Sequence, residues 1–125
     1  MSQNNNYSRL VQKCILYIET DYMYILGVDD IAQTLNVSKS HLIREFSKEV
    51  GITPNKYLVA QRLSQAKILL LNEDVPIESI AEAVGFSCGN YFSKVFKKEY
   101  GITPREYIAN TPVINPSKVN GRIYL

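Results

Sequence analysis

The chain has 125 residues, of which 46% are apolar and 21% charged, with a formal net charge of +2. These values are typical of one compact domain or of two very small subdomains that share a core, and no apolar run is long enough to cross a bilayer. The N-terminal sequence MSQNNNYSRL lacks the apolar core of a secretory signal, which predicts a cytoplasmic protein with reduced cysteines at Cys14 and Cys88.

Charge is grouped by segment along the chain. Residues 21–35 and 73–82 contain acids and no base, whereas residues 54–72 and 87–98 contain bases and no acid. Blocks of this size are also common on solvated helix faces, so charge by itself assigns no function.

The first predicted helix-turn-helix lies in the N-terminal half. Residues 28–35 predict a short helix, because Ile31 and Leu35 have helical spacing and two aspartates lie at the N-terminal end. Ser38 is the predicted cap of a second helix, which Gly51 ends in the left-handed conformation. Two helices joined by a tight turn form the helix-turn-helix pattern.

The phrase GITP follows this second helix and recurs fifty residues later. In each copy the glycine ends one helix, the threonine caps the next and the proline takes its first position. A tyrosine three residues after each proline is expected to fold its ring back onto the preceding helix pair. The predicted structural anchors are therefore Gly51, Pro54, Tyr57, Gly101, Pro104 and Tyr107.

A long linker helix is predicted over residues 54–72, which contain no glycine and no internal proline. At ~1.5 Å per residue it would be roughly 28 Å long, comparable to the ~34 Å between successive major-groove faces on one side of a duplex. Apolar residues, among them Leu63, Ala66 and Leu70, cover more than one side. This pattern predicts a helix that packs against a unit at each end.

The pattern of the first unit is repeated in the C-terminal half. A short helix is predicted from Pro76 to near Gly85, followed by Ser87 as the cap of a second helix. Eleven residues are identical between segments 31–58 and 80–108, at offsets of 49 and then 50. Such a duplication favours two helix-turn-helix units over a two-repeat protein scaffold, since solenoids need about three repeats or more.

The outer faces of the two capped helices are polar, small and cationic. Arginine can bind guanine through two parallel hydrogen bonds, asparagine can do the same with adenine, and isoleucine can contact a thymine methyl. Serine and lysine can reach bases or phosphates, and glycine allows close approach to the DNA backbone. The predicted DNA-binding residues are Lys39, Ser40, Ile43, Arg44 and Ser47 in the first helix and Gly89, Asn90, Ser93, Lys94, Lys97 and Lys98 in the second.

The linker string QRLSQAKILLL and the second-unit string SIAEAVGFSCGNYFSKVFKKEYGITPREY closely resemble the arabinose-operon-regulator (AraC/XylS) family of bacterial transcription factors. The resemblance covers about residues 8–110. It implies an all-α DNA-binding domain of about seven helices, with a first unit over 8–53, the linker helix over 54–72 and a second unit over 73–110.

The resemblance also implies a function. Helices 38–50 and 87–100 are expected to enter adjacent major grooves of double-stranded DNA. The protein is expected to regulate transcription, commonly as an activator that contacts RNA polymerase. Arg62 matches the linker arginine of the family and joins the expected DNA-binding residues, whereas Asn36 replaces the usual glycine before the first cap.

Catalysis is not indicated. His41 is the only histidine, no cysteine or acidic cluster has metal-ligand spacing, and no glycine-rich loop follows a strand. We therefore predict no enzyme activity, no metal and no cofactor. His41 is expected to donate to a phosphate or to pack beside the helix start. Cys88 is interpreted as a small residue facing DNA, with an oxidant-sensing thiol as the alternative.

Because the two units are direct repeats in one chain, a monomer is expected to read an asymmetric operator, without membrane association. Residues 1–7 are predicted to be flexible, and residues 111–125 to form an irregular tail. The sequence is compatible with a stand-alone regulator and with the DNA-binding part of a longer one.

Overall fold

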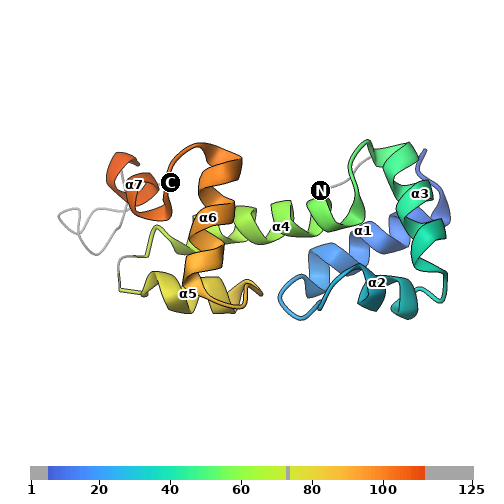
Figure 1. Cartoon of the computed structure of the whole chain (residues 1–125), viewed down its shortest axis with the longest axis horizontal. Coiled ribbons are helices and arrows are strands. Elements are labelled where there is room, and N and C mark those ends of the chain that lie inside the picture. Colours follow the sequence, from blue (N-terminus) through green and yellow to red (C-terminus); the bar gives the residue numbers. More distant parts are fainter. Residues whose placement is uncertain (1–5, 73, 112–125) are drawn as a thin grey trace, which may run out of the picture. The chain divides into compact units, whose positions relative to one another are not determined.

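The computed structural model describes residues 6–72 and 74–111, which form seven α-helices and no strand (Figure 1). The helices are α1 (Arg9–Asp21), α2 (Val28–Thr34), α3 (Lys39–Val50), α4 (Pro54–Leu69), α5 (Ile77–Ala83), α6 (Gly89–Tyr100) and α7 (Pro104–Asn110). The predicted all-α fold with about seven helices is confirmed. The predicted flexible N-terminus, 1–7, and irregular tail, 111–125, lie almost wholly outside the described residues.

The chain divides into two compact units, and the boundary falls inside α4, between Arg62 and Leu63. The linker helix is shorter than predicted, because α4 ends at Leu69 instead of residue 72. The backbone tightens there: Leu71 N donates to Ile68 O at 3.3 Å, and the amide of the next residue bonds three residues back at 3.0 Å. Bonds of this spacing close a helix with a tighter turn.

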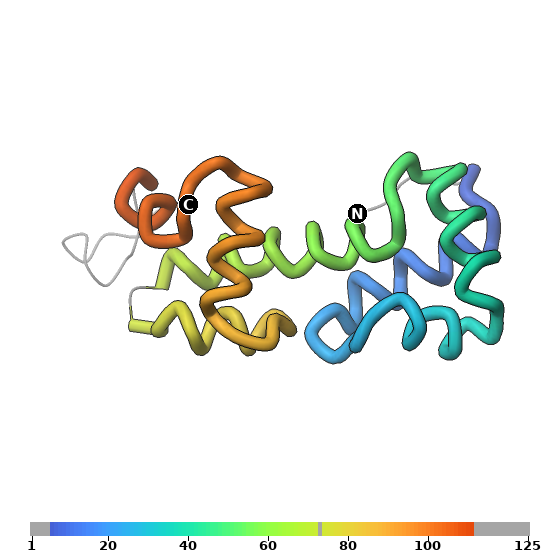
Figure 2. Tube along the Cα trace, viewed as in Figure 1, coloured from blue at the N-terminus to red at the C-terminus, as the bar shows by residue number. Residues whose placement is uncertain are grey.

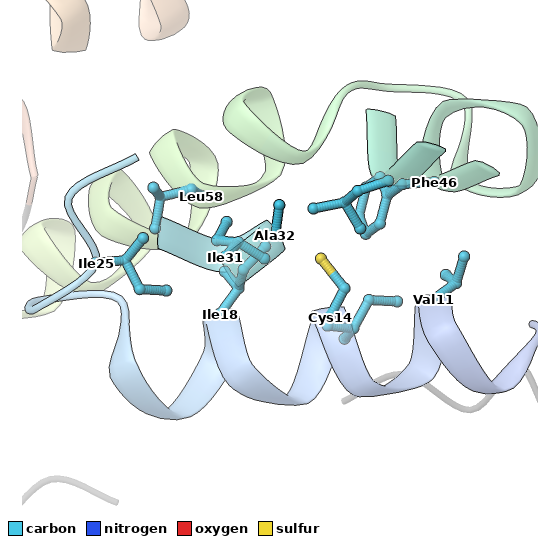
Figure 3. Close-up of a cluster of buried hydrophobic side chains, with 10 residues drawn as sticks. Val11, Cys14, Ile18, Ile25, Ile31, Ala32, Phe46 and Leu58 are labelled. Atoms are coloured by element: carbon cyan, nitrogen blue, oxygen red, sulfur yellow. The ribbon is translucent and has the colours of Figure 1, made fainter. Parts of the chain in front are cut away.

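In unit 1, helices α1, α2 and α3 and the first half of α4 enclose one apolar core (Figure 3). Val11, Cys14 and Ile18 extend from α1 into this core, where they meet Ile31 of α2 and Phe46 of α3. Complete burial of each large apolar side chain stabilises the fold by about 1.5–3 kcal/mol. The complete cluster is Val11, Cys14, Ile15, Ile18, Ile25, Ile31, Ala32, Leu42, Phe46 and Leu58.

Unit 2 buries a second apolar set, contributed by the other half of α4 and by α5 and α6. Its centre is a chain of aromatic rings: the Phe92 ring lies 5.2 Å from Phe86 and 5.7 Å from Phe96, measured between centroids. In the trace, α6 crosses α5, and the two helices are in contact (Figure 2). The buried side chains of this unit include Leu63, Ala66, Leu70, Ile80, Ala81, Val84, Phe86, Phe92 and Phe96.

Each copy of GITP connects two helices in the same way. Gly51 and Gly101 have φ angles of 94° and 84°, the left-handed conformation that a helix stop requires. The ring of Tyr57 lies edge-on to Phe46 at 5.6 Å, and the ring of Tyr107 lies edge-on to Phe96 at 5.7 Å. These two ring pairs connect α3 to α4 and α6 to α7.

The turns inside the two helix-turn-helix units differ by one residue. Asn36, with φ 60°, occupies the position that Gly85, with φ 107°, has in unit 2. Asparagine adopts a positive φ angle more readily than most other residues. Ser38 caps α3 as predicted, and its Oγ accepts from His41 N at 3.1 Å. The predicted cap of α6 at Ser87 is wrong: the N-cap is Cys88, so the turn before α6 is one residue longer than the turn before α3.

Candidate nucleic-acid interface

The outer face of α3 carries five of the predicted DNA-binding residues. Because α3 turns Leu42 and Phe46 into the core of unit 1, Lys39, Ser40 and Arg44 are left exposed on the outside. The other two predicted residues, Ile43 and Ser47, are half-buried.

Two cations of this face are held by weak contacts. Arg44 Nη2 lies 3.1 Å from His41 Nδ1, and Arg44 Nε lies 3.5 Å from Glu45 Oε2. Lys39 Nζ lies 3.3 Å from Asp29 Oδ1, in a pair whose side chains are 55% and 83% exposed. Exposed ion pairs contribute about 0–1 kcal/mol, so a phosphate or a base edge can replace these partners at little cost.

The two half-buried residues of this face, Ile43 and Ser47, also take part in packing within unit 1. Ile43 is half-buried, so packing within unit 1 accounts for part of its apolar side chain. Ser47 Oγ is buried, and among the described residues it has no hydrogen-bond partner. A buried unpaired hydroxyl costs about 1–3 kcal/mol, and this oxygen is too buried to contact a base or a phosphate directly.

The start of α6 is built differently from that of α3. Cys88 has extended backbone and makes no side-chain capping bond. Instead Glu78, in the first turn of α5, accepts from Gly89 N through Oε1 at 2.9 Å. A Cβ atom on Gly89 would lie 2.4 Å from that oxygen. The contact with Glu78 thus explains why this buried position is a glycine, whereas the sequence suggested close approach to DNA as the reason.

The remaining residues of α6 present a basic outer surface. Asn90, Lys94, Lys97 and Lys98 are exposed, and Ser93 is half-buried. The basic residues Lys97 and Lys98 lie in the last turn, where they also interact favourably with the C-terminal end of the helix dipole.

An open groove of about 490 Å³ lies beside the first turns of α6, within unit 2. Asn90 and Ser93 line it together with Glu78 and Arg105. Arg105 is exposed, and the sequence reasoning missed it. Arg105 directly follows Pro104, the first residue of the capped helix α7, and this position in the sequence could have indicated an exposed cation.

Arg62 has an internal role in unit 1. Its Nε donates to Tyr22 O at 2.9 Å, and its Nη2 donates to Ile25 O. These bonds tie α4 to the loop between α1 and α2. The guanidinium is therefore half-buried and directed into the unit, whereas the sequence placed it among the DNA contacts.

The described part of the chain has two free cysteines and no cluster of metal ligands. In residues 6–72 and 74–111, no group of three or more His, Cys, Asp or Glu side chains could hold a metal ion. None of the helices in these ranges is long and apolar enough to cross a membrane. Burial raises the pKa of the Cys14 thiol to about 12, which makes it unreactive, whereas Cys88 is exposed.

Comparison with known proteins gives consistent matches. A family model described as a helix-turn-helix domain, of the AraC type, matches residues 31–110. A solved structure, the C-terminal domain of the response regulator AraT from Geobacillus stearothermophilus, is 34% identical with a TM-score of 0.83. The match covers 89% of this chain and 92% of that one.

Two curated relatives are longer than the region that matches this chain. A helix-turn-helix-type transcriptional regulator of Pseudoalteromonas carrageenovora is 37% identical over 98 residues, and the lactose operon transcription activator of Staphylococcus xylosus is 34% identical over 97. Each match covers 78% of this chain. The chain spans 58% of the first relative and 35% of the second.

Proposed function

The chain belongs to the AraC family of DNA-binding transcription regulators, and we propose that it reads one asymmetric operator with α3 and α6 in adjacent major grooves. One observation carries this proposal. Two helices, each capped at its start and stopped by a left-handed glycine, bury an equivalent apolar pair and direct polar and basic residues outward.

Base reading is assigned to four residues in the first two turns of α3 and α6. Arg44 binds guanine through two hydrogen bonds after it releases His41 and Glu45. Asn90 binds adenine in the same two-bond manner, and Ser40 and Ser93 donate to neighbouring bases or phosphates. These contacts require the N-terminal half of each helix to lie in the major groove, as in other helix-turn-helix proteins.

Phosphate binding is assigned to the lysines of α6, together with Lys39 of α3. Lys97 and Lys98 are exposed in the last turn of α6 and reach the backbone on either side of the groove. Contacts of this type fix the orientation of the protein on the duplex and carry no sequence information. They also make affinity depend steeply on salt, because each neutralised phosphate releases counterions.

The wider role is proposed as activation of transcription, with RNA polymerase as the partner and a cytoplasmic location beside the chromosome. The lactose operon regulator of S. xylosus is named an activator, which supports this direction of regulation. Because α3 and α6 stand in one chain as direct repeats, a monomer carries both readers. Catalysis has no place in this proposal.

Selection from a random duplex pool tests the proposal. The bound fraction is expected to enrich one asymmetric sequence with two conserved blocks about one helical turn, roughly 10 base pairs, apart. Titration of the enriched duplex against a shuffled duplex of the same composition is expected to show a large affinity ratio and a steep loss of affinity with salt.

Three results would contradict parts of the proposal. A palindromic consensus would contradict reading by a monomer. Equal affinity for the enriched and shuffled duplexes would contradict sequence-specific reading. No binding to any duplex at low salt would instead favour a helical scaffold for protein contacts.

A further inference from the structure

The capping of α6 comes from another helix. Cys88, its N-cap, makes no side-chain bond, and Glu78 of α5 accepts from Gly89 N at 2.9 Å in a partly buried bond. By contrast, α3 is capped by its own N-cap, Ser38. The first turn of α6 is therefore held by a side chain that lies eleven residues earlier in the sequence.

Gly89 and Glu78 fit each other as a pair. Gly89 has helical backbone, so its conformation does not require glycine. Space requires it: a Cβ atom would lie 2.4 Å from Glu78 Oε1 and 3.5 Å from Glu78 Cα. Any larger residue at position 89 must displace the carboxylate that caps the helix.

The same two positions are connected in unit 1, with a weaker contact. Asp29 stands 49 residues before Glu78, and Lys39 stands 50 residues before Gly89. In unit 1 these two are joined by an exposed ion pair at 3.3 Å between flexible side chains. In unit 2 the acid bonds directly to a backbone amide, which fixes the helix itself and not only a side chain.

We propose that Glu78 is a positioning residue for DNA reading by α6. Its carboxylate holds the first turn of α6 against α5, so that Asn90 and Ser93 face outward beside the groove that Glu78 also lines. Charge-assisted bonds to a backbone amide at a helix start are strong and directional. This inference rests on the proposed function and adds the origin of discrimination in one half of the operator.

The negative charge of Glu78 is expected to affect DNA affinity in the direction opposite to its positioning role. An acid beside DNA repels phosphates, so its removal by itself would strengthen binding to every duplex. Loss of positioning instead weakens binding to the operator and lowers discrimination at the base pairs that α6 reads. Two conservative variants separate these effects: Glu78→Gln keeps the reach and removes the charge, and Glu78→Asp keeps the charge and removes the reach.

The experiment measures the Kd of the whole chain for the selected operator and for two operators altered in either conserved block. We expect Glu78→Ala and Glu78→Asp to weaken operator binding roughly 5- to 10-fold, the effect of a lost helix cap, and to lower discrimination in one block only. Glu78→Gln is expected to stay within about twofold of wild type in discrimination. Glu82→Ala, an exposed acid of the same helix, is the control for charge.

Gly89 provides an independent test. Gly89→Ala is expected to reduce discrimination in the same block as Glu78→Ala, and to have no further effect in the Glu78→Ala background, where the Cβ finds space. Circular dichroism melting identifies any variant that fails to fold. If Glu78→Ala does not fold, the discrimination measured for Glu78→Asp and Gly89→Ala tests the inference. Equal losses in both blocks, additive losses in the double variant, or full discrimination by Glu78→Asp would overturn the inference. Failure of the wild type to discriminate any operator would overturn the proposed function itself.

Discussion

The hydroxyl of Tyr57, in the first turn of α4, donates a hydrogen bond to Glu19 Oε2 of α1 at 3.0 Å. Tyr107 stands at the matching position of unit 2, and there the nearby charge is a cation: Lys67 Nζ lies 5.9 Å from the ring centre of Tyr107 and 4.5 Å from that of Tyr100. The duplicated tyrosine thus keeps its ring contact in both units, whereas the charged side chain near it is an acid in unit 1 and a base in unit 2.

Alkaline pH is expected to destabilise the protein through Tyr57. Burial and the bond to Glu19 raise the pKa of Tyr57 from its ordinary value of 10.0 to about 12. Because the folded state holds this proton more tightly, the contribution of Tyr57 to the free energy of unfolding is complete below pH 10 and is lost as the pH rises toward 12. Thermal melts from pH 8 to 12 are expected to show a steeper decline for wild type than for Tyr57→Phe.

The control for this titration is Tyr24→Phe, since the Tyr24 side chain is 77% exposed. Its melting temperatures are expected to follow those of wild type at every pH. A Tyr57→Phe curve parallel to wild type would show that the bond to Glu19 does not couple ionisation to folding.

Arg44→Ala is expected to lower discrimination at a single base pair by about 1–3 kcal/mol, the usual value of a two-bond arginine contact to guanine. The measurement is a set of Kd values for operators substituted at each position. Arg44 is exposed and its partners are weak, so the melting temperature is expected to stay close to wild type. An equal loss on operator and shuffled duplexes would assign Arg44 to phosphate instead.

Lys98→Ala is expected to weaken binding to all duplexes by a similar factor, because an exposed lysine in the last turn of α6 is suited to phosphate. The slope of log Kd against log salt is expected to fall by about one unit. Lys13→Ala, which removes an exposed cation of α1, serves as the control for net charge. A change of base preference in Lys98→Ala would contradict this assignment.

Arg62→Ala is expected to act on stability before it acts on DNA binding. The substitution leaves the carbonyl oxygens of Tyr22 and Ile25 without this partner, at a cost of about 1–3 kcal/mol if they stay buried. Arg62→Lys is expected to rescue poorly, since an ammonium cannot reproduce the planar two-point contact. A variant with wild-type melting temperature and weakened affinity would return Arg62 to the DNA contacts expected from the family resemblance.

Local signals in the sequence were sufficient for most helix ends. Ser38, Gly51 and Gly101 act through their own backbone neighbours, so their roles can be deduced from the order of residues alone. The outward direction of Arg44 and Lys94 follows in the same way from helical spacing against the buried phenylalanines.

Contacts between distant residues could not be deduced in this way. The cap that Glu78 gives to Gly89 and the bonds of Arg62 to the α1–α2 loop depend on how helices pack, which spacing does not encode. The bounds of α1 were a different omission: Ser8 as a cap and apolar residues at 11, 14, 15 and 18 have the spacing of a buried helix, but they have no repeated counterpart to draw attention to them.

Helix α4 belongs to both cores at once. Leu58 is buried in unit 1 and Leu63 in unit 2, and no loop separates them along the helix. A cut at the boundary would therefore divide α4 into two short halves, one left in each unit. Although the modules are duplicated, neither can be excised intact, and loss of helical structure in the middle of α4 would withdraw core residues from both. Unfolding in the middle of α4 is therefore expected to loosen α3 and α6 together.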